Sequence, residues 1–169
     1  MTPGNLFLIG MPGAGKSYWA EQLAAAYGLQ CIDLDNLIRV RTGMDIPAFF
    51  DRYGEQAFRS LEAETLKQVI EVFPGNTVVA CGGGTPCFGD NLQRMKEAGR
   101  VVYLRADTDR LAENLEASGE LRPLLQGGDL PSRLSALLEA RAVCYEQAHL
   151  IMDVASLQLA DFGFPPRGV

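Results

Sequence analysis

The sequence predicts an α/β fold in which a five-stranded parallel sheet lies between two layers of helices, a three-layer sandwich. Two observations predict it. Short apolar runs alternate with helical patterns along the chain, and a glycine-rich loop joins the first apolar run to the first helical pattern. Because the sequence shows no internal repeat and no linker-like stretch, we expect a single domain over residues 1–169.

The five expected strands are short apolar runs separated by helical patterns. The turn sequence Pro74-Gly75-Asn76 leads the chain into the third strand. The strands are expected at residues 5–9, 30–34, 77–81, 100–104 and 150–154.

The expected helices follow from apolar spacing and from their end signals. Gly28 lies just past the first helix, and Thr42-Gly43 breaks the second helical stretch. Residues 119–131 contain Gly127-Gly128 and two prolines, which is typical of a mobile loop. The other expected helices cover residues 16–27, 55–73, 91–97, 108–117 and 132–147, and a short tail covers 155–169.

The composition narrows the class of protein. Apolar residues make up 47% of the 169 residues and charged residues 21%, as in an ordinary soluble protein. We expect a cytoplasmic protein without a membrane partner, because no apolar run approaches the roughly 18 residues of a membrane span and the N-terminus lacks the pattern of a signal peptide. The net charge of −6 and the lack of a basic tract argue against nucleic acid as a partner. The four cysteines show no C-x-x-C pair, which favours buried reduced thiols over a zinc site or a disulfide framework.

The glycine-rich loop carries the strongest chemical signal. Residues 10–17, Gly-Met-Pro-Gly-Ala-Gly-Lys-Ser, fit G-x-x-x-x-G-K-S between an apolar run and a helix. Such a loop turns backbone N–H groups, here those of Gly13, Ala14 and Gly15, toward phosphate oxygens. Lys16 is then placed to reach the β- and γ-phosphates and Ser17 to hold Mg²⁺. The alternative is a glycine-rich turn that matches by chance, and the loop alone does not separate a kinase from a GTPase or a motor.

Two carboxylates follow the second apolar run. Asp33 and Asp35 are two positions apart, which puts both side chains on one face if the strand continues through residue 34. Ligands of parallel α/β sheets gather at the carboxyl ends of strands. Asp33 is then a candidate Mg²⁺ ligand and Asp35 a candidate base for an attacking hydroxyl. The alternative is that Asp35 only caps the helix that begins at Asn36.

Three arginines and a glycine triplet stand out in this acidic chain. Arg59 and Glu62 are spaced to pair on one helix face, Arg122 lies in the 119–131 loop, and Arg141 lies in the last long helix. Each arginine taken alone is more often a solvated surface charge. Residues 82–84 are three glycines at the end of an apolar strand, where we expect the backbone to approach a substrate or phosphate closely; a plain turn is the alternative.

Together these segments resemble the shikimate kinase family, and the resemblance runs from about Leu6 to Val154. It implies a P-loop NTPase fold similar to that of nucleoside monophosphate kinases. It also implies transfer of the γ-phosphate of ATP to the 3-hydroxyl of shikimate, with Mg²⁺, in aromatic amino-acid biosynthesis. The matching pieces are Gly10 to Ser17, Asp33-Leu34-Asp35, Gly54-Glu55, Phe58-Arg59, Glu62, Gly82 to Gly84, Arg122-Pro123-Leu124-Leu125, Arg141 and Tyr145.

The resemblance implies a role for each matching residue. Asp33 lies near Mg²⁺, and Asp35 binds the shikimate hydroxyls and acts as the base. Arg59 and Arg141 bind the shikimate carboxylate with the glycines Gly82, Gly83 and Gly84. Arg122 closes over the transferring phosphate as part of a lid at residues 119–131. Apart from the resemblance, Tyr18 follows the loop serine, so we expect it to touch the nucleotide phosphates through its backbone N–H only. The catalytic set is then Lys16, Asp35 and Arg122.

Two departures from the family pattern concern the adenine end of the site. Asn114 lies near the point where the family has an adenine-stacking arginine, and the tail after residue 154 is short. The alternatives are a kinase of another small hydroxy acid such as gluconate, and a catalytically idle binding module. A nucleoside monophosphate kinase is disfavoured, because no segment announces a base-reading pocket. We expect a monomer.

Overall fold

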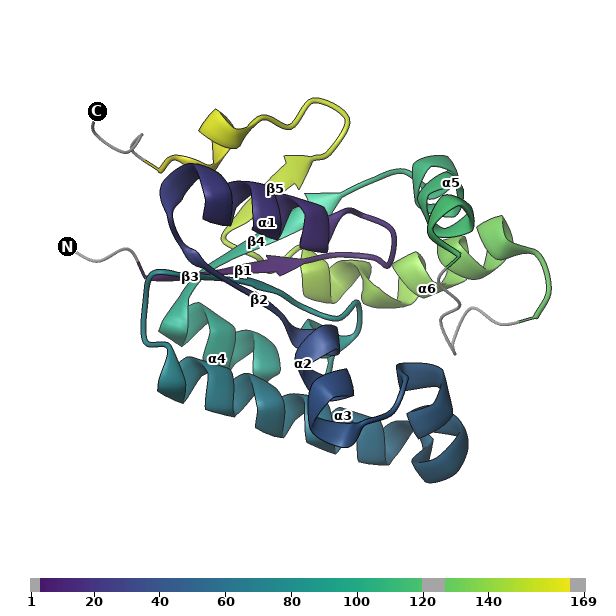
Figure 1. The fold of residues 1–169 in the computed structure, drawn as a ribbon. Helices are drawn as coiled ribbons and strands as arrows, with labels where there is room; N and C mark the ends of the chain where they lie inside the picture. Colours follow the sequence, from purple (N-terminus) through teal and green to yellow (C-terminus); the bar gives the residue numbers. More distant parts are fainter. Residues whose placement is uncertain (1–3, 120–126, 165–169) are drawn as a thin grey trace.

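The computed structural model describes residues 4–119 and 127–164, and in them the α/β sandwich is confirmed. All strand pairs are parallel, and the strand order is β2-β3-β1-β4-β5 (Figure 1). The strands are β1 (Asn5–Ile9), β2 (Gln30–Asp33), β3 (Thr77–Ala80), β4 (Gly99–Arg105) and β5 (Leu150–Asp153).

The central strands are buried and the edge strands are not. Every residue of β1 and β3 is buried, because helices cover both faces of the sheet there. At the edges, β2 and β5 leave several side chains exposed. Cys31 on β2 is therefore exposed, which corrects the expectation of four buried thiols; Cys81 is buried, and Cys87 and Cys144 are half-buried.

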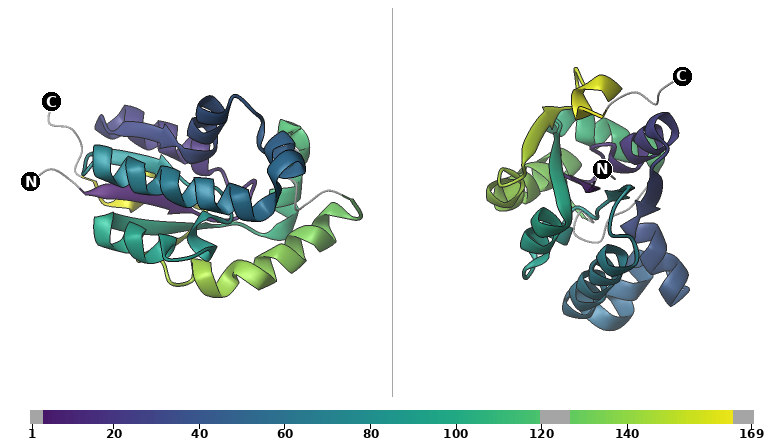
Figure 2. Two further views of the ribbon diagram at one scale, coloured as in Figure 1. Left: turned by 90° about the horizontal axis from the view of Figure 1, so that it is seen from below. Right: turned by 90° about the vertical axis from the view of Figure 1, so that its left-hand side faces the viewer.

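Helices form the two outer layers. On one side lies α1 (Lys16–Tyr27), and on the other lie α3 (Ile46–Val72) and α4 (Asn91–Ala98) (Figures 1 and 2). The remaining elements are α2 (Leu34–Thr42), α5 (Thr108–Ser118), α6 (Leu130–Tyr145) and the short 3₁₀ helices η1 (Thr85–Cys87) and η3 (Leu159–Phe162). Among the described residues, no helix is both long and apolar enough to cross a bilayer.

Glycines mark two of the breaks in the helical layer. Gly43 ends α2 in the left-handed region, with φ 67°, as the expected break requires. Gly54 interrupts α3 with φ 82° and ψ 170°, so the long helix expected from residue 55 is the second part of α3. The helical part before Gly54 lies within the stretch that was expected to be helical.

The boundaries of several elements differ by one or two residues from those expected, and a side-chain cap explains two of these differences. The second strand ends at Asp33 rather than at residue 34, because the Asp33 side chain accepts a hydrogen bond from the Asn36 backbone N–H and so caps α2. The last long helix begins at Leu130 rather than at residue 132. There Asp129 caps the helix through the Ser132 N–H, and Pro131 fits the first turn.

Candidate active site

The phosphate loop connects β1 to α1, as the sequence predicts. Gly15 is the N-cap of α1 and has a φ of 89°, a left-handed conformation that suits glycine. The Ala14 N–H donates to the Met11 carbonyl over 3.1 Å, which closes a turn within the loop. The loop therefore ends at the N-terminus of a helix, where backbone N–H groups and the helix dipole favour an anion.

Lys16 is held against this loop. Its side chain is buried, and the Nζ atom donates to the carbonyls of Gly10 and Met11 over 2.8 Å each. These two bonds place the ammonium beside the loop that would surround phosphate oxygens. The position is the one expected for a lysine that neutralises phosphate charge.

Ser17 and Asp33 form an oxygen-rich pair next to the loop. The Ser17 hydroxyl donates to Oδ2 of Asp33, while Oδ1 of Asp33 accepts from the Asn36 N–H over 3.0 Å. A hydroxyl and a carboxylate are hard oxygen donors of the kind that Mg²⁺ takes from proteins, the remaining positions being filled by water and phosphate. The residues present therefore fit a magnesium site.

Asp35 reaches the same site by a route that the sequence reasoning had wrong. The two carboxylates do not share a strand face, because β2 ends at Asp33 and Asp35 lies in the first turn of α2. The alternative that Asp35 caps the helix is also wrong, because the capping side chain is that of Asp33. Both carboxylates nevertheless face one cavity.

This cavity lies at the carboxyl edge of the sheet and has a volume of about 890 Å³. Lys16, Asp35 and Gly83 all line it, so the loop, α2 and the glycine triplet share one space. The wall also contains Arg39 of α2 and Arg110 of α5, which the sequence analysis missed. The predicted residues on the wall are Gly13, Ala14, Gly15, Lys16, Ser17, Tyr18, Asp33, Asp35, Gly83 and Asn114.

The spacing of the two missed arginines offered a signal. Arg39 lies four positions after Asp35 in α2, and Arg110 lies four positions before Asn114 in α5. Side chains four apart on a helix share one face. Once Asp35 and Asn114 are assigned to the site, the helical period brings both arginines to it.

Asn114 itself bonds to the phosphate loop. Its Nδ2 atom donates to the Gly13 carbonyl over 2.8 Å and so ties α5 to a segment far away in the sequence. The chain therefore uses this position to hold the loop as well as to line the cavity.

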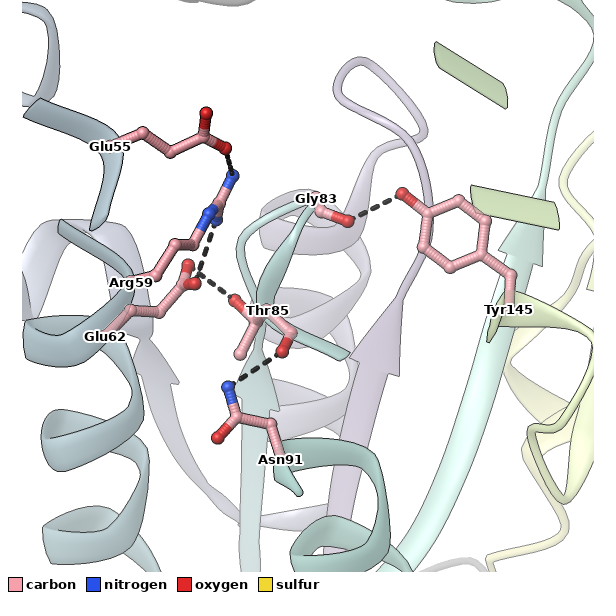
Figure 3. Close-up of polar contacts among 7 residues, drawn as sticks. All are labelled: Glu55, Arg59, Glu62, Gly83, Thr85, Asn91 and Tyr145. Atoms are coloured by element: carbon pink, nitrogen blue, oxygen red, sulfur yellow. Dashed lines mark hydrogen bonds and ion pairs between the residues drawn. The ribbon is translucent and has the colours of Figure 1, made fainter. Parts of the chain in front are cut away.

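Arg59 does not line the cavity itself but lies in a network of polar groups, most of them buried (Figure 3). Its Nη1 donates to Glu62 Oε1 over 2.9 Å, which confirms the predicted pair, and its Nη2 lies 3.5 Å from Glu55 Oε1. The ring of Phe88 lies on the guanidinium at 4.2 Å from its centroid. The Nε atom of Arg59 is buried without a hydrogen-bond partner in the described part of the chain.

Glu62 is almost fully buried, with 1% of its surface exposed. Burial raises the pKa of its carboxyl, and the Asp35 charge adds to this effect. The Arg59 guanidinium and a hydrogen bond from Thr85 act in the opposite direction, but the net pKa stays above its usual range. The two donors therefore favour the charged form of Glu62, while burial favours the neutral form.

The glycine triplet makes room for the side chains of the site. None of Gly82, Gly83 and Gly84 has a positive φ, so backbone conformation does not require glycine there. A Cβ at position 82 would lie 2.9 Å from Glu62 Oε2, and one at position 84 would lie 2.6 Å from the Arg59 guanidinium. The close approach expected at the triplet is thus made by protein side chains.

Arg141 approaches the triplet from α6. It is buried, and a Cβ at position 83 would lie 3.0 Å from its Nη1. The Tyr145 hydroxyl, one turn later, donates to the Gly83 carbonyl over 2.6 Å (Figure 3). Arg59 therefore packs against Gly84 and Arg141 against Gly83, and neither arginine lines the cavity itself.

Arg122 and residues 120–126 of the predicted lid lie outside the described residues. Beyond β5, the chain forms η3, and its buried Phe162 packs on Trp19 with ring centroids 5.9 Å apart.

A family model described as shikimate kinase matches residues 12–161. A shikimate kinase of Nitrosomonas europaea is 40% identical over 152 residues, covering 89% of this chain and 71% of the relative. One of Geobacter sulfurreducens is 40% identical over 157 residues, covering 93% and 85%.

The chain belongs to the shikimate kinase family. Its activity is the ATP-dependent phosphorylation of shikimate, and its place is in the shikimate pathway of aromatic amino-acid synthesis, as the resemblance implied.

Solved structures of this family have the same fold. The shikimate kinase of Bacteroides thetaiotaomicron superimposes with a TM-score of 0.84 at 36% identity, covering 92% of this chain and 89% of that one. The Acinetobacter baumannii enzyme, solved in complex with shikimate, gives a TM-score of 0.87 at 31% identity, covering 95% and 89%. A gluconokinase from Sinorhizobium meliloti, at 22% identity and a TM-score of 0.52, shares the fold alone.

Proposed function

We propose that phosphoryl transfer from ATP to the 3-hydroxyl of shikimate takes place in the cavity between Lys16 and Asp35. One observation carries this proposal: Lys16, Ser17, Asp33, Asp35 and Gly83 line a single cavity. The phosphate loop and the glycine triplet thus face a common space, which is large enough for both reactants.

The phosphates of ATP bind in the loop. The backbone N–H groups of Gly13, Gly15, Ser17 and Tyr18 surround them at the N-terminus of α1, where the helix dipole favours negative charge. The N–H of Ala14 joins them once it leaves the Met11 carbonyl. Lys16 leaves its bonds to the loop carbonyls for the β- and γ-phosphate oxygens and offsets the charge that accumulates during transfer.

Ser17 and Asp33 would hold the magnesium ion of Mg-ATP. Their oxygens are in contact with each other, so both donors would be available together to a small hard cation. The metal would supply positive charge that offsets part of the phosphate charge.

Shikimate binds beside the glycine triplet. Its carboxylate pairs with Arg59 and Arg141, because planar guanidinium groups bind carboxylates by paired hydrogen bonds. Gly82, Gly83 and Gly84 let these side chains pack against the backbone, with Gly83 itself on the cavity wall.

Asp35 is proposed as the base. It lies on the cavity wall, and a Cβ at position 82 would lie 3.0 Å from its Oδ1 atom, so its carboxylate lies next to the glycine triplet on a cavity that the phosphate loop also lines. From there it orients the attacking hydroxyl and accepts its proton as the bond to phosphorus forms.

We further propose that residues 119–131 act as the lid and that Arg122 contacts the transferring phosphate. Exclusion of water matters in this reaction, because water would otherwise accept the phosphate. The chain is proposed to work as a single domain over residues 1–169 and as a cytoplasmic monomer with no nucleic-acid or membrane partner.

A coupled ADP-release assay with Mg-ATP tests the reaction. Shikimate, gluconate, quinate and no acceptor are compared, and release with shikimate alone is expected. Gluconate tests the acceptor pocket, since gluconate kinases share the fold. Equal release with gluconate would show that the arginine pair does not select the acceptor.

A further inference from the structure

Thr85 lies just behind the proposed shikimate site, at the start of η1. It is fully buried, and its hydroxyl donates to Glu62 Oε2 over 2.8 Å (Figure 3). The other carboxylate oxygen, Oε1, accepts from Arg59 over 2.9 Å. Glu62 therefore holds Arg59 with one oxygen while Thr85 holds the second.

The bond from Thr85 restricts the rotation of the Glu62 carboxylate. A carboxylate that is anchored only through Oε1 can turn about its terminal bond, since this torsion is soft. The second donor fixes the plane of the carboxylate and thereby the direction in which Oε1 meets Arg59. The same bond favours the charged form of Glu62, whose pKa burial would otherwise raise further.

Thr85 is itself fixed by the backbone around it. Its N–H donates to the Gly82 carbonyl over 3.1 Å, and its carbonyl accepts from Asn91 Nδ2 over 2.9 Å. Asn91 is buried with 1% of its surface exposed, at the start of α4. The direction of the Thr85 hydroxyl is thus set by a turn that is bonded at both ends.

The same turn contacts Arg59 a second time. Phe88, three residues after Thr85, places its ring 4.2 Å from the Arg59 guanidinium. A guanidinium on an aromatic face is attracted to the electrons of the ring. The segment from Thr85 to Asn91 therefore acts on Arg59 through Glu62 and through Phe88.

We propose that Thr85 is a positioning residue for shikimate binding: its hydroxyl orients Glu62, and Glu62 orients Arg59 toward the shikimate carboxylate. The proposal rests on the role assigned above to Arg59. Thr85 does not touch the reacting atoms, so its effect is confined to the affinity for the acceptor.

The test compares Thr85→Val, which keeps the shape and removes the hydroxyl, with Thr85→Ser, which keeps the hydroxyl. Thr77→Val is the matched control, because Thr77 is a buried threonine at the opposite end of β3 whose hydroxyl donates to the Gly75 carbonyl over 3.1 Å. Thr85→Val is expected to raise the KM for shikimate about 5- to 20-fold, the size of a lost hydrogen bond to a charged group. The KM for ATP and kcat should stay within about 2-fold, and Thr85→Ser and Thr77→Val should resemble the parent.

Two results would overturn the proposal. One is a KM for shikimate in Thr85→Val that equals that of the Thr77→Val control. The other is a rise in the KM values for shikimate and ATP by the same factor, which indicates a general loss of structure. If valine lowers the yield of folded protein, Thr85→Ala removes the same hydroxyl and carries the same expectation.

A double-mutant cycle tests the route through Glu62. In a Glu62→Gln background, Thr85→Val should add less than about 2-fold to the KM for shikimate, because the two changes remove parts of one chain of contacts. Fully multiplicative effects would show that Thr85 acts elsewhere.

Arg59→Lys separates this proposal from the assignment of Arg59. If Arg59→Lys leaves the KM for shikimate unchanged, the role of Arg59 fails. If it raises that KM while Thr85→Val does not, only the role of Thr85 fails.

Discussion

The proposed active site has two halves, one built mainly from backbone groups and the other mainly from side chains. The phosphate half is made of consecutive residues, and most of its expected contacts come from the backbone of one loop and one helix end. The acceptor half is made of side chains from α3, α6 and η1, packed around three glycines.

This difference determines how each half responds to change. A site built largely from main chain depends mainly on the shape of its loop and on a few side chains, such as Lys16. A side-chain site depends on several partners at once, so a loss at one position is transmitted to the next.

Lys16→Ala should break the phosphate half. Removal of a cation that stabilises the developing charge is expected to lower kcat about 10²- to 10³-fold. The fold should remain, because the lost bonds are two hydrogen bonds to loop carbonyls. Steady-state kinetics measures kcat, and circular dichroism measures whether the fold is kept. Retained turnover would contradict the assignment of the loop to phosphate binding.

Arg141→Ala should break the acceptor half alone. Loss of a charge-assisted pair is expected to raise the KM for shikimate about 30-fold and the KM for ATP much less. Arg94→Ala is the control, since Arg94 pairs with Asp90 on the surface. Equal changes in both KM values would contradict the division into two halves.

Gly84→Ala sharpens the comparison, because it adds a single methyl group. The new Cβ would lie 2.6 Å from the Arg59 guanidinium, so that side chain must move. We expect the KM for shikimate to rise about 10-fold, the scale of overpacking at a buried site. Gly4→Ala, whose Cβ would have a nearest contact of 3.7 Å, should leave the kinetics unchanged.

The KM for shikimate should also depend on pH through Glu62. The pKa of this carboxyl is raised, chiefly by burial, so the group takes up a proton as pH falls through that value and loses its attraction for Arg59. The KM is therefore expected to increase several-fold toward acid pH. In Glu62→Gln the KM should be high but flat over the same range, and a profile of unchanged slope would assign the titration to another group.

Asn114→Ala should have the smallest effect. It removes one bond of 2.8 Å to the Gly13 carbonyl at an exposed position, so the KM for ATP should rise about 2- to 3-fold. The KM for shikimate should not change. If the KM for shikimate rose more than the KM for ATP, the two halves would not be independent of each other.

The sequence predicted the phosphate half better than the acceptor half for a physical reason. The loop motif is local, so its strand, turn and helix can be recognised from neighbouring residues. Asp35 was assigned to the site by a wrong argument, because the cap at Asp33 shortens the strand and moves Asp35 into α2.

Contacts between distant segments escaped the sequence analysis. Thr85 reaches Glu62 across 23 residues, and Tyr145 reaches Gly83 across 62. No periodicity encodes such a pair, because it depends on how α3, α6 and η1 pack together. The glycine triplet predicted a close approach to the backbone, but only the fold shows which side chains make it.

The single tryptophan of the chain gives the phosphate half an optical label. Trp19 lines the cavity, its ring packs on Phe162, and a Cβ at Gly15 would lie 3.6 Å from its Cδ1. Indole emission responds to such surroundings, so nucleotide binding can be followed by intrinsic fluorescence without a dye or a coupled enzyme. The proposed shikimate site lies at the other half, so the direct effect of shikimate on the same signal should be weaker. Fluorescence titrations with nucleotide before and after the addition of shikimate can therefore test the order in which the two substrates bind.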